Sequence, residues 1–309
     1  MPLMKAIAWI DRIISTRRTG TPLILPHPGY ATPDSLVARG RVLGRPVNHS
    51  KVIASFRTRE LAGVSVAGQT SETLTDDEGY FTLALPRPAQ AGWVNVPVRA
   101  GDHQTDVPVL VPRPDARFGI ISDIDDTVML TKAWSLPLNL WTTLRGRPDT
   151  RIVFPDAVAL LEALGEEGRN PVYYVSSAPW NMLSFMEEVF RLNGLPRGPM
   201  FLRDWGGGRD RNLLAVPAPV HKARAIDTLF AANPTLDYLL LGDTGQHDAT
   251  IYLDAARRHP GRIRAVVLRQ AGKKRLALAD AYAALGIPLH VVGAFSALPP
   301  AQELTLGKA

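Results

Sequence analysis

The sequence predicts an α/β protein in two parts, a small all-β sandwich followed by a larger unit with a parallel sheet. Two observations lead to this fold class. Between residues 34 and 115, short β-type runs alternate with turn signals and show no helical periodicity, a pattern typical of small antiparallel sandwiches. From residue 116 onward, apolar runs alternate with amphipathic helical segments, as in parallel sheets whose crossovers are helices.

The composition of the 309 residues limits the classes of function. Hydrophobic residues make up 46% and charged residues 21%, as in ordinary folded proteins, and the length fits about two domains. The net charge of +6 favours anionic partners such as phosphorylated metabolites, lipid surfaces or nucleic acid. Cysteine is absent, which excludes disulfides and thiol nucleophiles. No apolar run approaches the ~20 residues that cross a bilayer, so we expect a cytoplasmic protein, with membrane association as the alternative.

Residues 1–33 are expected to form an N-terminal amphipathic helix and a tether. Ile7, Ile10, Ile13 and Ile14 recur at helical spacing, and residues 21–33 are rich in proline and glycine. Packing of the helix on the body of the protein and binding at a membrane surface both fit this pattern.

Residues 34–115 are expected to form the sandwich. The clearest turn lies at residues 75–79, which read Thr-Asp-Asp-Glu-Gly. Pro97 and Pro108 fall inside two runs, and proline cannot donate a ladder hydrogen bond, so we expect those strands at sheet edges. The predicted strands are residues 36–43, 63–67, 80–85, 93–99 and 106–111.

Residues 116–309 are expected to form the second domain, with strands at residues 118–122, 172–175, 200–202, 238–241, 263–268 and 289–292. Helices are predicted at residues 157–164, 182–190, 223–230, 249–257 and 276–285. The second of these should end at Gly194, a typical helix C-terminal residue. The tail from residue 298 onward is expected to be loosely held.

The first strand of this domain ends in an unusual concentration of charge. The sequence Asp123-Ile-Asp125-Asp-Thr127 contains three carboxylates and no basic residue. Two carboxylates about 4 Å apart repel by roughly 4 kcal/mol at an effective dielectric near 20, so a hard metal ion is a natural partner. Phosphoryl transfer, with one carboxylate attacking and its neighbour moving a proton, and a plain acidic turn both fit. An EF-hand calcium loop is excluded, because its sixth position is Val128 and its twelfth is Trp134.

Polar side chains also follow other predicted strands. Ser176 and Ser177 come after one strand at the mouth of a helix, which suits either a phosphate cradle or a simple N-cap. Asp243 and Asp248 follow another strand, and Lys222 lies near the start of a helix, where a surface lysine is the alternative. Since ligands sit at the carboxyl ends of parallel strands, we expect these side chains to gather at one site.

This series of motifs resembles the haloacid dehalogenase superfamily of aspartate-nucleophile phosphotransferases. That resemblance covers residues 117 to about 292. A narrower likeness is to the actin-patch-associated phosphatidate phosphatase family, and the β-type region ahead of residue 116 shares it. Family members often have Pro-Glu in place of Ala249-Thr250 and glycine in place of Asp156. The motifs that carry the likeness are Ser122-Asp-Ile-Asp-Asp-Thr127, Tyr174-Val-Ser-Ser-Ala-Pro-Trp-Asn181, His221-Lys222 and Gly242-Asp-Thr-Gly-Gln-His-Asp248-Ala-Thr-Ile-Tyr252.

The resemblance implies a Rossmann-like parallel sheet with a small cap and a phosphomonoester hydrolase that uses Mg²⁺. Asp123 would form an aspartyl-phosphate, and Asp125 would protonate the leaving group and then activate water. The metal would be held by Asp123, Asp243 and the backbone carbonyl of Asp125, with Asp248 orienting the shell. The residues implied to contact phosphate are Thr127, Ser176, Ser177 and Lys222. All of these contacts support the electrostatic stabilisation on which phosphoryl transfer depends.

An insertion between Thr127 and Arg151 is too short for a large folded cap, so we expect an open site. Its apolar side chains beside two arginines suit contact with a lipid interface, and a small cap packed on its own core is the alternative. These side chains are Trp134, Leu136, Leu138, Leu140 and Trp141, beside Arg145 and Arg147.

Three functions fit the sequence. The first is a Mg²⁺-dependent phosphatase acting on lipid phosphates such as phosphatidate, with peripheral membrane contact. The second is the same chemistry on a soluble or nucleic-acid phosphoester. A nucleic-acid partner is not expected, because no dense Lys/Arg stripe alternates with aromatic residues. The third is an inert binding module, ranked last because every motif aspartate is retained. Protein partners are not indicated.

Overall fold

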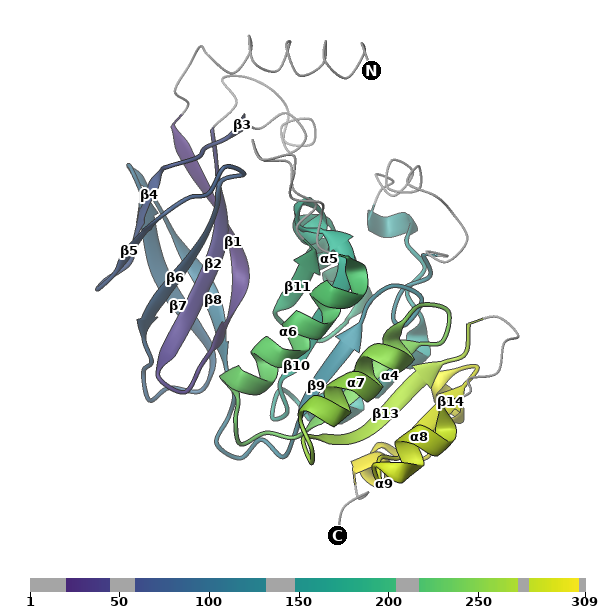
Figure 1. Ribbon diagram of the computed structural model, residues 1–309. Helices are drawn as coiled ribbons and strands as arrows, with labels where there is room; N and C mark the ends of the chain where they lie inside the picture. The colour runs from purple at the N-terminus through teal and green to yellow at the C-terminus, as the bar shows by residue number, and fades with distance from the viewer. Residues whose placement is uncertain (1–20, 45–58, 132–147, 204–216, 272–277, 306–309) are drawn as a thin grey trace.

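The structure, a computed structural model, describes residues 21–44, 59–131, 148–203, 217–271 and 278–305. These residues form two sheets, one in each part of the chain (Figure 1). The predicted N-terminal helix and the apolar insertion with Trp134 and Trp141 lie outside the described residues.

The first sheet is mostly antiparallel and nearly closed, with the order β3-β2-β1-β8-β7-β4-β5. Strand β2 also pairs with β6, and β6 contacts β5, so the sheet folds back on itself instead of forming two facing sheets. The strands are β1 (Pro22–Ala31), β2 (Ser35–Gly44), β3 (Arg59–Glu60), β4 (Ser65–Ala67), β5 (Glu72–Leu74), β6 (Tyr80–Pro86), β7 (Gly92–Ala100) and β8 (His103–Val111).

Strand β1 occupies the segment predicted to be a tether. It pairs with β2 from Pro22 to Ala31, with an irregularity after His27, and buries Ile24 and Ala31 in the core of the sheet. The proline content predicted a linker, but Ile24 and Ala31 pack in the core of the sheet, and the β1–β2 pairing includes Pro22 and Pro26. The tether is therefore a strand.

The prediction that Pro97 and Pro108 mark edge strands was wrong, because β7 and β8 lie inside the sheet. The two strands pair with each other along their whole length. Their outer pairings are short: β7 meets β4 only at Arg99, and β8 meets β1 at Val109 and Leu110. Neither proline lies in those outer registers, so the missing N–H groups interrupt no pairing there.

The second sheet is entirely parallel, with the order β11-β10-β9-β12-β13-β14. All six predicted runs form strands, which confirms the prediction of a parallel α/β sheet. The strands are β9 (Gly119–Asp123), β10 (Val172–Pro179), β11 (Met200–Arg203), β12 (Tyr238–Asp243), β13 (Ile263–Arg269) and β14 (Leu289–Val292).

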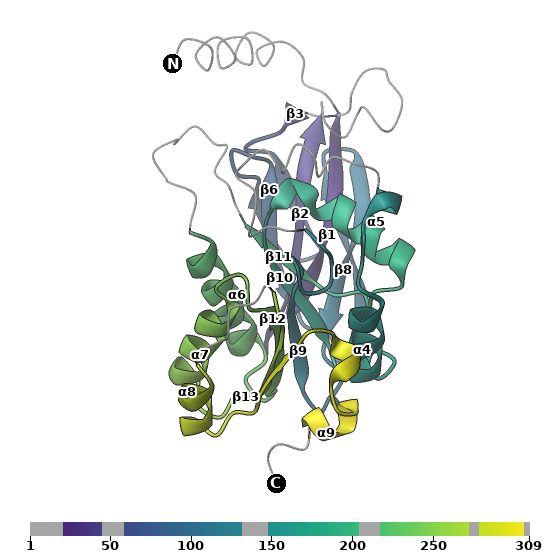
Figure 2. The same cartoon turned by 90° about the vertical axis from the view of Figure 1, so that its right-hand side faces the viewer.

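Helices cover both faces of the parallel sheet (Figure 2). Alternate strand residues face α6, α7 and α8 on one side and α4, α5 and α9 on the other, so the unit has three layers. The helices are α4 (Pro155–Gly165), α5 (Leu183–Asn193), α6 (Ala218–Ala232), α7 (Asp248–Arg258), α8 (Ala279–Ala284) and α9 (Ala301–Thr305), with short 3₁₀ turns η1 (Pro148–Thr150), η2 (Trp180–Met182) and η3 (Phe295–Ala297).

Two helix ends can be compared with the predictions. Helix α5 is followed by Gly194 with a left-handed φ of 72°, as predicted. The tail was expected to be loosely held, but α9 buries Leu304 in the core, so that prediction was wrong as far as residue 305. Among the helices that the structure describes, none combines the length and apolar composition needed to span a bilayer.

Strand β9 lies at the centre of the sheet and approaches β12 closely at Gly119. A Cβ atom at Gly119 would lie 2.3 Å from Cε1 of Tyr238. The Tyr238 ring cannot easily move, because it stacks on Phe230 and its hydroxyl donates to the Leu229 carbonyl oxygen at 3.0 Å. Glycine is therefore required at this position.

We predict that Gly119→Ala destabilises the protein by about 1–3 kcal/mol through overpacking. Gly165→Ala is the matched control, since its Cβ would meet nothing closer than 3.8 Å. Thermal unfolding should show a lower midpoint for the first variant and an unchanged or higher midpoint for the second. Equal midpoints would show that the β9–β12 contact relaxes freely.

Candidate active site

Strand register brings the predicted motifs together at the carboxyl edge of the parallel sheet. Asp123 is the last residue of β9, and it pairs with Val175 on β10. On the other side, Ser122 pairs with Leu241 on β12. The residues that follow Val175 and Leu241 therefore emerge on either side of Asp123, as expected for a parallel sheet.

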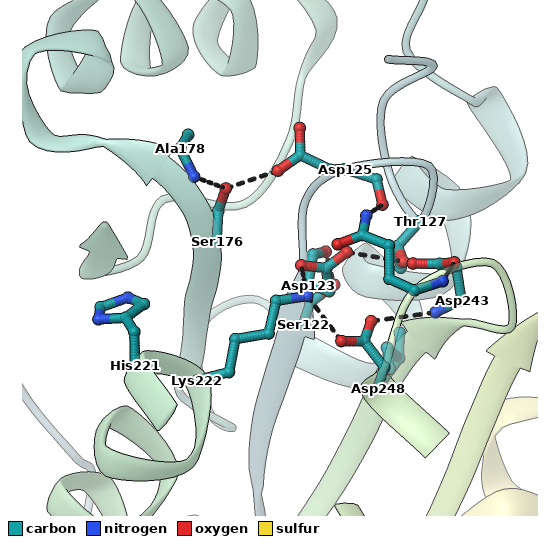
Figure 3. Close-up of polar contacts among 12 residues, drawn as sticks. Ser122, Asp123, Asp125, Thr127, Ser176, Ala178, His221, Lys222, Asp243 and Asp248 are labelled. Atoms are coloured by element: carbon teal, nitrogen blue, oxygen red, sulfur yellow. Dashed lines mark hydrogen bonds and ion pairs between the residues drawn. The ribbon is translucent and has the colours of Figure 1, made fainter. Parts of the chain in front are cut away.

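Lys222, from the first turns of α6, joins two of the carboxylates (Figure 3). Its Nζ atom lies 2.6 Å from Oδ1 of Asp123 and 2.6 Å from Oδ1 of Asp248. Thr127 donates to the other oxygen of Asp123 at 3.2 Å. Both carboxylate oxygens of Asp123 therefore have a hydrogen-bond donor. The Lys222 ammonium has three N–H donors, and its contacts with Asp123 and Asp248 use two of them.

Asp125 forms a second contact group with the end of β10. Ser176 donates its hydroxyl to Oδ2 of Asp125 at 2.7 Å, and the Ser176 oxygen accepts the backbone N–H of Ala178 at 2.9 Å. Ser177 is half-buried at the next position, and successive strand residues point to opposite faces. Its role as a phosphate ligand stays a prediction.

The loop after β12 orients Asp243 and Asp248. Backbone N–H groups of Gly245 and Gln246 donate to Oδ1 of Asp243 at 2.5 and 2.8 Å, and Asp248 accepts the Asp243 N–H at 3.2 Å. Gly242 permits this approach, since a Cβ there would lie 2.7 Å from an Asp248 oxygen. The Gln246 side chain reaches across to donate to the Asp125 carbonyl oxygen at 3.3 Å.

Burial dominates the electrostatics of the cluster. Burial and then the charge of Asp248 raise the pKa of Asp123 well above its usual value, although Lys222 acts in the opposite direction. Burial also raises the pKa of Asp125, against the Ser176 hydrogen bond. Burial and Asp248 raise the pKa of Asp243 to about 7. Burial alone would lower the pKa of Lys222, but the charges of Asp123 and Asp248 have the larger effect and raise it.

Three of these carboxylates form a group suited to a metal ion. One oxygen each from Asp123, Asp243 and Asp248 lies within 4.8 Å of the others, and all three residues are buried. Within the described residues, Oδ2 of Asp243 is buried without a hydrogen-bond partner. A buried acceptor of this kind is costly unless a donor or cation satisfies it. Hard oxygen ligands favour Mg²⁺, Ca²⁺ or Mn²⁺, so the residues present fit a metal.

Arg269 and Asp156 support the site and were not predicted as functional residues. Arg269, at the end of β13, donates from Nε to the Thr127 carbonyl oxygen at 3.0 Å and forms a two-pronged ion pair with Asp156 at 2.8 and 3.1 Å. Its guanidinium lies 4.2 Å from the ring centroids of both Phe154 and Phe295. Arg269 directly follows a run predicted as a strand, and this position at the carboxyl edge of the sheet could have identified it as a residue near the site.

The part of the chain that resembles known proteins contains all the residues of this site. Residues 118–270 match the family described as phosphatidate phosphatase APP1, catalytic domain. The chain is 25% identical over 152 residues to phosphatidate phosphatase APP1 of Saccharomyces cerevisiae, which covers 49% of this chain and 26% of that protein. It is 27% identical over 174 residues to the uncharacterized protein C29B5.04c of Schizosaccharomyces pombe, covering 54% and 27%.

The chain thus spans about a quarter of the length of these curated relatives. Among solved structures, a chain of a Pnkp1/Rnl/Hen1 complex is similar with a TM-score of 0.34 and 14% identity, over 57% of each chain.

We predict that Asp156→Asn costs about 3 kcal/mol of stability, because it leaves the arginine charge buried and unpaired. A loss of this size lowers the unfolding midpoint by about 6–12 °C. Asp254→Asn, which breaks the exposed Asp254–Arg257 pair, should change it little. The Arg269 hydrogen bonds keep the pKa of Asp156 below its ordinary 3.8 against the effect of burial. The difference between wild type and Asp156→Asn should therefore persist above pH 4 and shrink as pH falls below it.

Proposed function

We propose that this chain hydrolyses phosphomonoesters of lipid phosphates such as phosphatidate, because residues 118–270 match the phosphatidate phosphatase APP1 catalytic domain. We assign the reaction to residues 116–309. The observation that carries the proposal is the meeting of Asp123, Lys222, Asp243 and Asp248 at the carboxyl edge of the sheet, beside the Asp125–Ser176 pair.

In the first step, a carboxylate oxygen of Asp123 attacks phosphorus, and the bond between phosphorus and the leaving oxygen breaks. The hydrogen bond from Thr127 and the ion pair with Lys222 hold the Asp123 carboxylate. Asp125 gives its proton to the leaving alkoxide. Its raised pKa favours the protonated form that a general acid needs.

In the second step, Asp125 accepts a proton from a water molecule that attacks the aspartyl-phosphate. The bond between phosphorus and Asp123 breaks, and inorganic phosphate leaves. Ser176 keeps the Asp125 carboxyl in one orientation through both steps. The two carboxylate contacts of Lys222 leave its third ammonium donor available for a phosphate oxygen.

We propose Mg²⁺ as the metal, held by Asp123 and Asp243 with Asp248 orienting them, and with the Asp125 carbonyl as a further ligand. When bound, the ion neutralises charge on the phosphate oxygens. Asp243 suits this role because its buried Oδ2 lacks a partner within the described residues.

The lipid substrate is supported by the family description and by exposed apolar side chains close in sequence to the site segments. Ile152 is 59% exposed. The next residue, Val153, forms a backbone bridge with Met129, which follows the Asp123 motif in the chain. Val220, two residues before Lys222, is 40% exposed. Exposed apolar groups favour contact with acyl chains or a bilayer surface, and the net charge of +6 favours anionic lipid.

The proposal is tested by phosphate release from phosphatidate vesicles, lysophosphatidate, a sugar phosphate and a 3′-phosphorylated oligonucleotide. We expect the highest kcat/KM on the lipids. Asp123→Asn should lower turnover by several orders of magnitude on every substrate, because no other carboxylate replaces the nucleophile. Its unfolding midpoint serves as the control. Preference for the oligonucleotide would overturn the lipid assignment, and an active Asp123→Asn variant would overturn the mechanism.

The metal site can be tested without activity. A saturating excess of Mg²⁺, about 100 times its Kd, should stabilise the wild type by roughly 2.7 kcal/mol, or about 5–10 °C. Asp243→Asn removes a ligand oxygen and should lose most of this shift. Ser176→Ala, in the same site but outside the carboxylate triad, should keep it. A full shift in Asp243→Asn would rule out this ligand set.

A further inference from the structure

One face of the first sheet carries an aromatic and cationic patch that faces the parallel sheet. Strand pairing sets His27 of β1 opposite Arg39 of β2, and Arg41 of β2 opposite Tyr80 of β6. Residues two apart on a strand share a face, so Arg39 and Arg41 point the same way. The opposite face of β2 carries Ala38 and Val42 into the core of the sheet.

Trp180 of the second unit is held against this patch. Its ring stacks on the His27 ring, with centroids 5.4 Å apart and planes 11° apart, and tilts against Tyr80 at 5.9 Å. The Arg39 guanidinium lies 5.4 Å from the Trp180 ring centroid. We name His27, Arg39, Tyr80 and Trp180 the Trp180 clamp. His27 is neutral in this stack, since burial and the two arginines lower its pKa to about 3.

Arg39 connects the two units directly. It is 7% exposed, and burial lowers its pKa to about 10, so it remains charged at neutral pH. Its guanidinium donates to the carbonyl oxygens of Pro28 at 2.6 Å and Met200 at 3.3 Å, in β1 and β11 respectively. It also lies 4.7 Å from the Phe201 ring centroid. Carbonyl oxygens and ring faces stabilise the buried charge.

The Trp180 clamp lies close to Ser176 in the chain, just after the end of β10. Trp180 is four residues after Ser176, whose hydroxyl holds Asp125 and accepts the Ala178 N–H. Between them, Pro179 pairs with Arg203 at the end of β11. Trp180 is therefore connected by the last residues of β10 to the side chain that contacts the proposed general acid.

We propose that the first sheet contributes to catalysis: His27 and Arg39 hold Trp180, and Trp180 thereby positions the end of β10, with Ser176, against Asp125. Trp180, His27 and Arg39 are positioning residues. The catalytic part of this inference rests on the proposed function, and the structural part does not.

The same interface supplies a matched control at its other end. Arg197 lies 4.3 Å from the Trp93 ring centroid, again an arginine on a tryptophan across the two units. Arg197 precedes β11, and both residues border a cavity with Pro171 and Val172 at the start of β10. This contact docks the units at the amino edge of the parallel sheet, away from Ser176.

The first measurement is turnover of para-nitrophenyl phosphate, which needs no membrane. Trp180→Ala and Arg39→Met should each lower kcat about tenfold to a hundredfold, the size expected for small misplacements of catalytic groups. KM should change much less, because the loss is in the transition state. Trp180→Phe keeps a ring in the stack and should restore most of kcat, and Arg197→Ala should leave kcat unchanged.

The second measurement is hydrogen–deuterium exchange of the peptide covering residues 176–182, which needs no activity. The same two variants should exchange faster there than the wild type, and Arg197→Ala should not. Arg39→Lys, which keeps the charge but loses the flat guanidinium, serves if a stronger variant fails to fold. Wild-type exchange in the clamp variants, or an equal loss of kcat in Arg197→Ala, would overturn the positioning role. An inactive wild type with the expected exchange pattern would instead overturn the proposed function alone.

Discussion

The site depends on the burial of several carboxylates around one ammonium group. Lys222 holds Asp123 and Asp248 in contact, and Asp243 lies close enough to both to share a metal ion. One positive charge cannot neutralise this group. Burial raises the pKa values of Asp123 and Asp243, and the neighbouring charge of Asp248 raises them further. A buried group of carboxylates like this one suits a bound cation.

The position of β9 at the centre of the sheet makes this arrangement reachable from distant parts of the chain. With β10 on one side and β12 on the other, the ends of three strands carry Asp123, Ser176 and Asp243 to one edge. Lys222 arrives from α6, which packs on the face formed by alternate residues of these strands. The absence of a side chain at Gly119 allows β9 to pair closely with β12, beside the Tyr238 ring.

The candidate catalytic side chains are supported by contacts with neighbouring elements as well as by one another. Arg269 secures the Thr127 carbonyl from β13, and Gln246 bonds the Asp125 carbonyl from the loop after β12. Trp180 stacks on His27 of the first sheet. The Thr127 and Asp125 carbonyls lie just beyond the end of β9, and Trp180 directly follows the last residue of β10.

The sequence by itself determined the parallel sheet, its six strands and the candidate catalytic residues. Apolar runs and helical periodicity are local properties, and the polar residues follow directly after those runs. The tertiary structure decided what depends on long-range pairing: β1 as a strand, the interior place of Pro97, and the burial of Leu304 by α9. It also decided the partners of Asp156 and Trp180, because each lies more than 100 residues from the arginine or histidine that holds it, and no local pattern encodes such a contact.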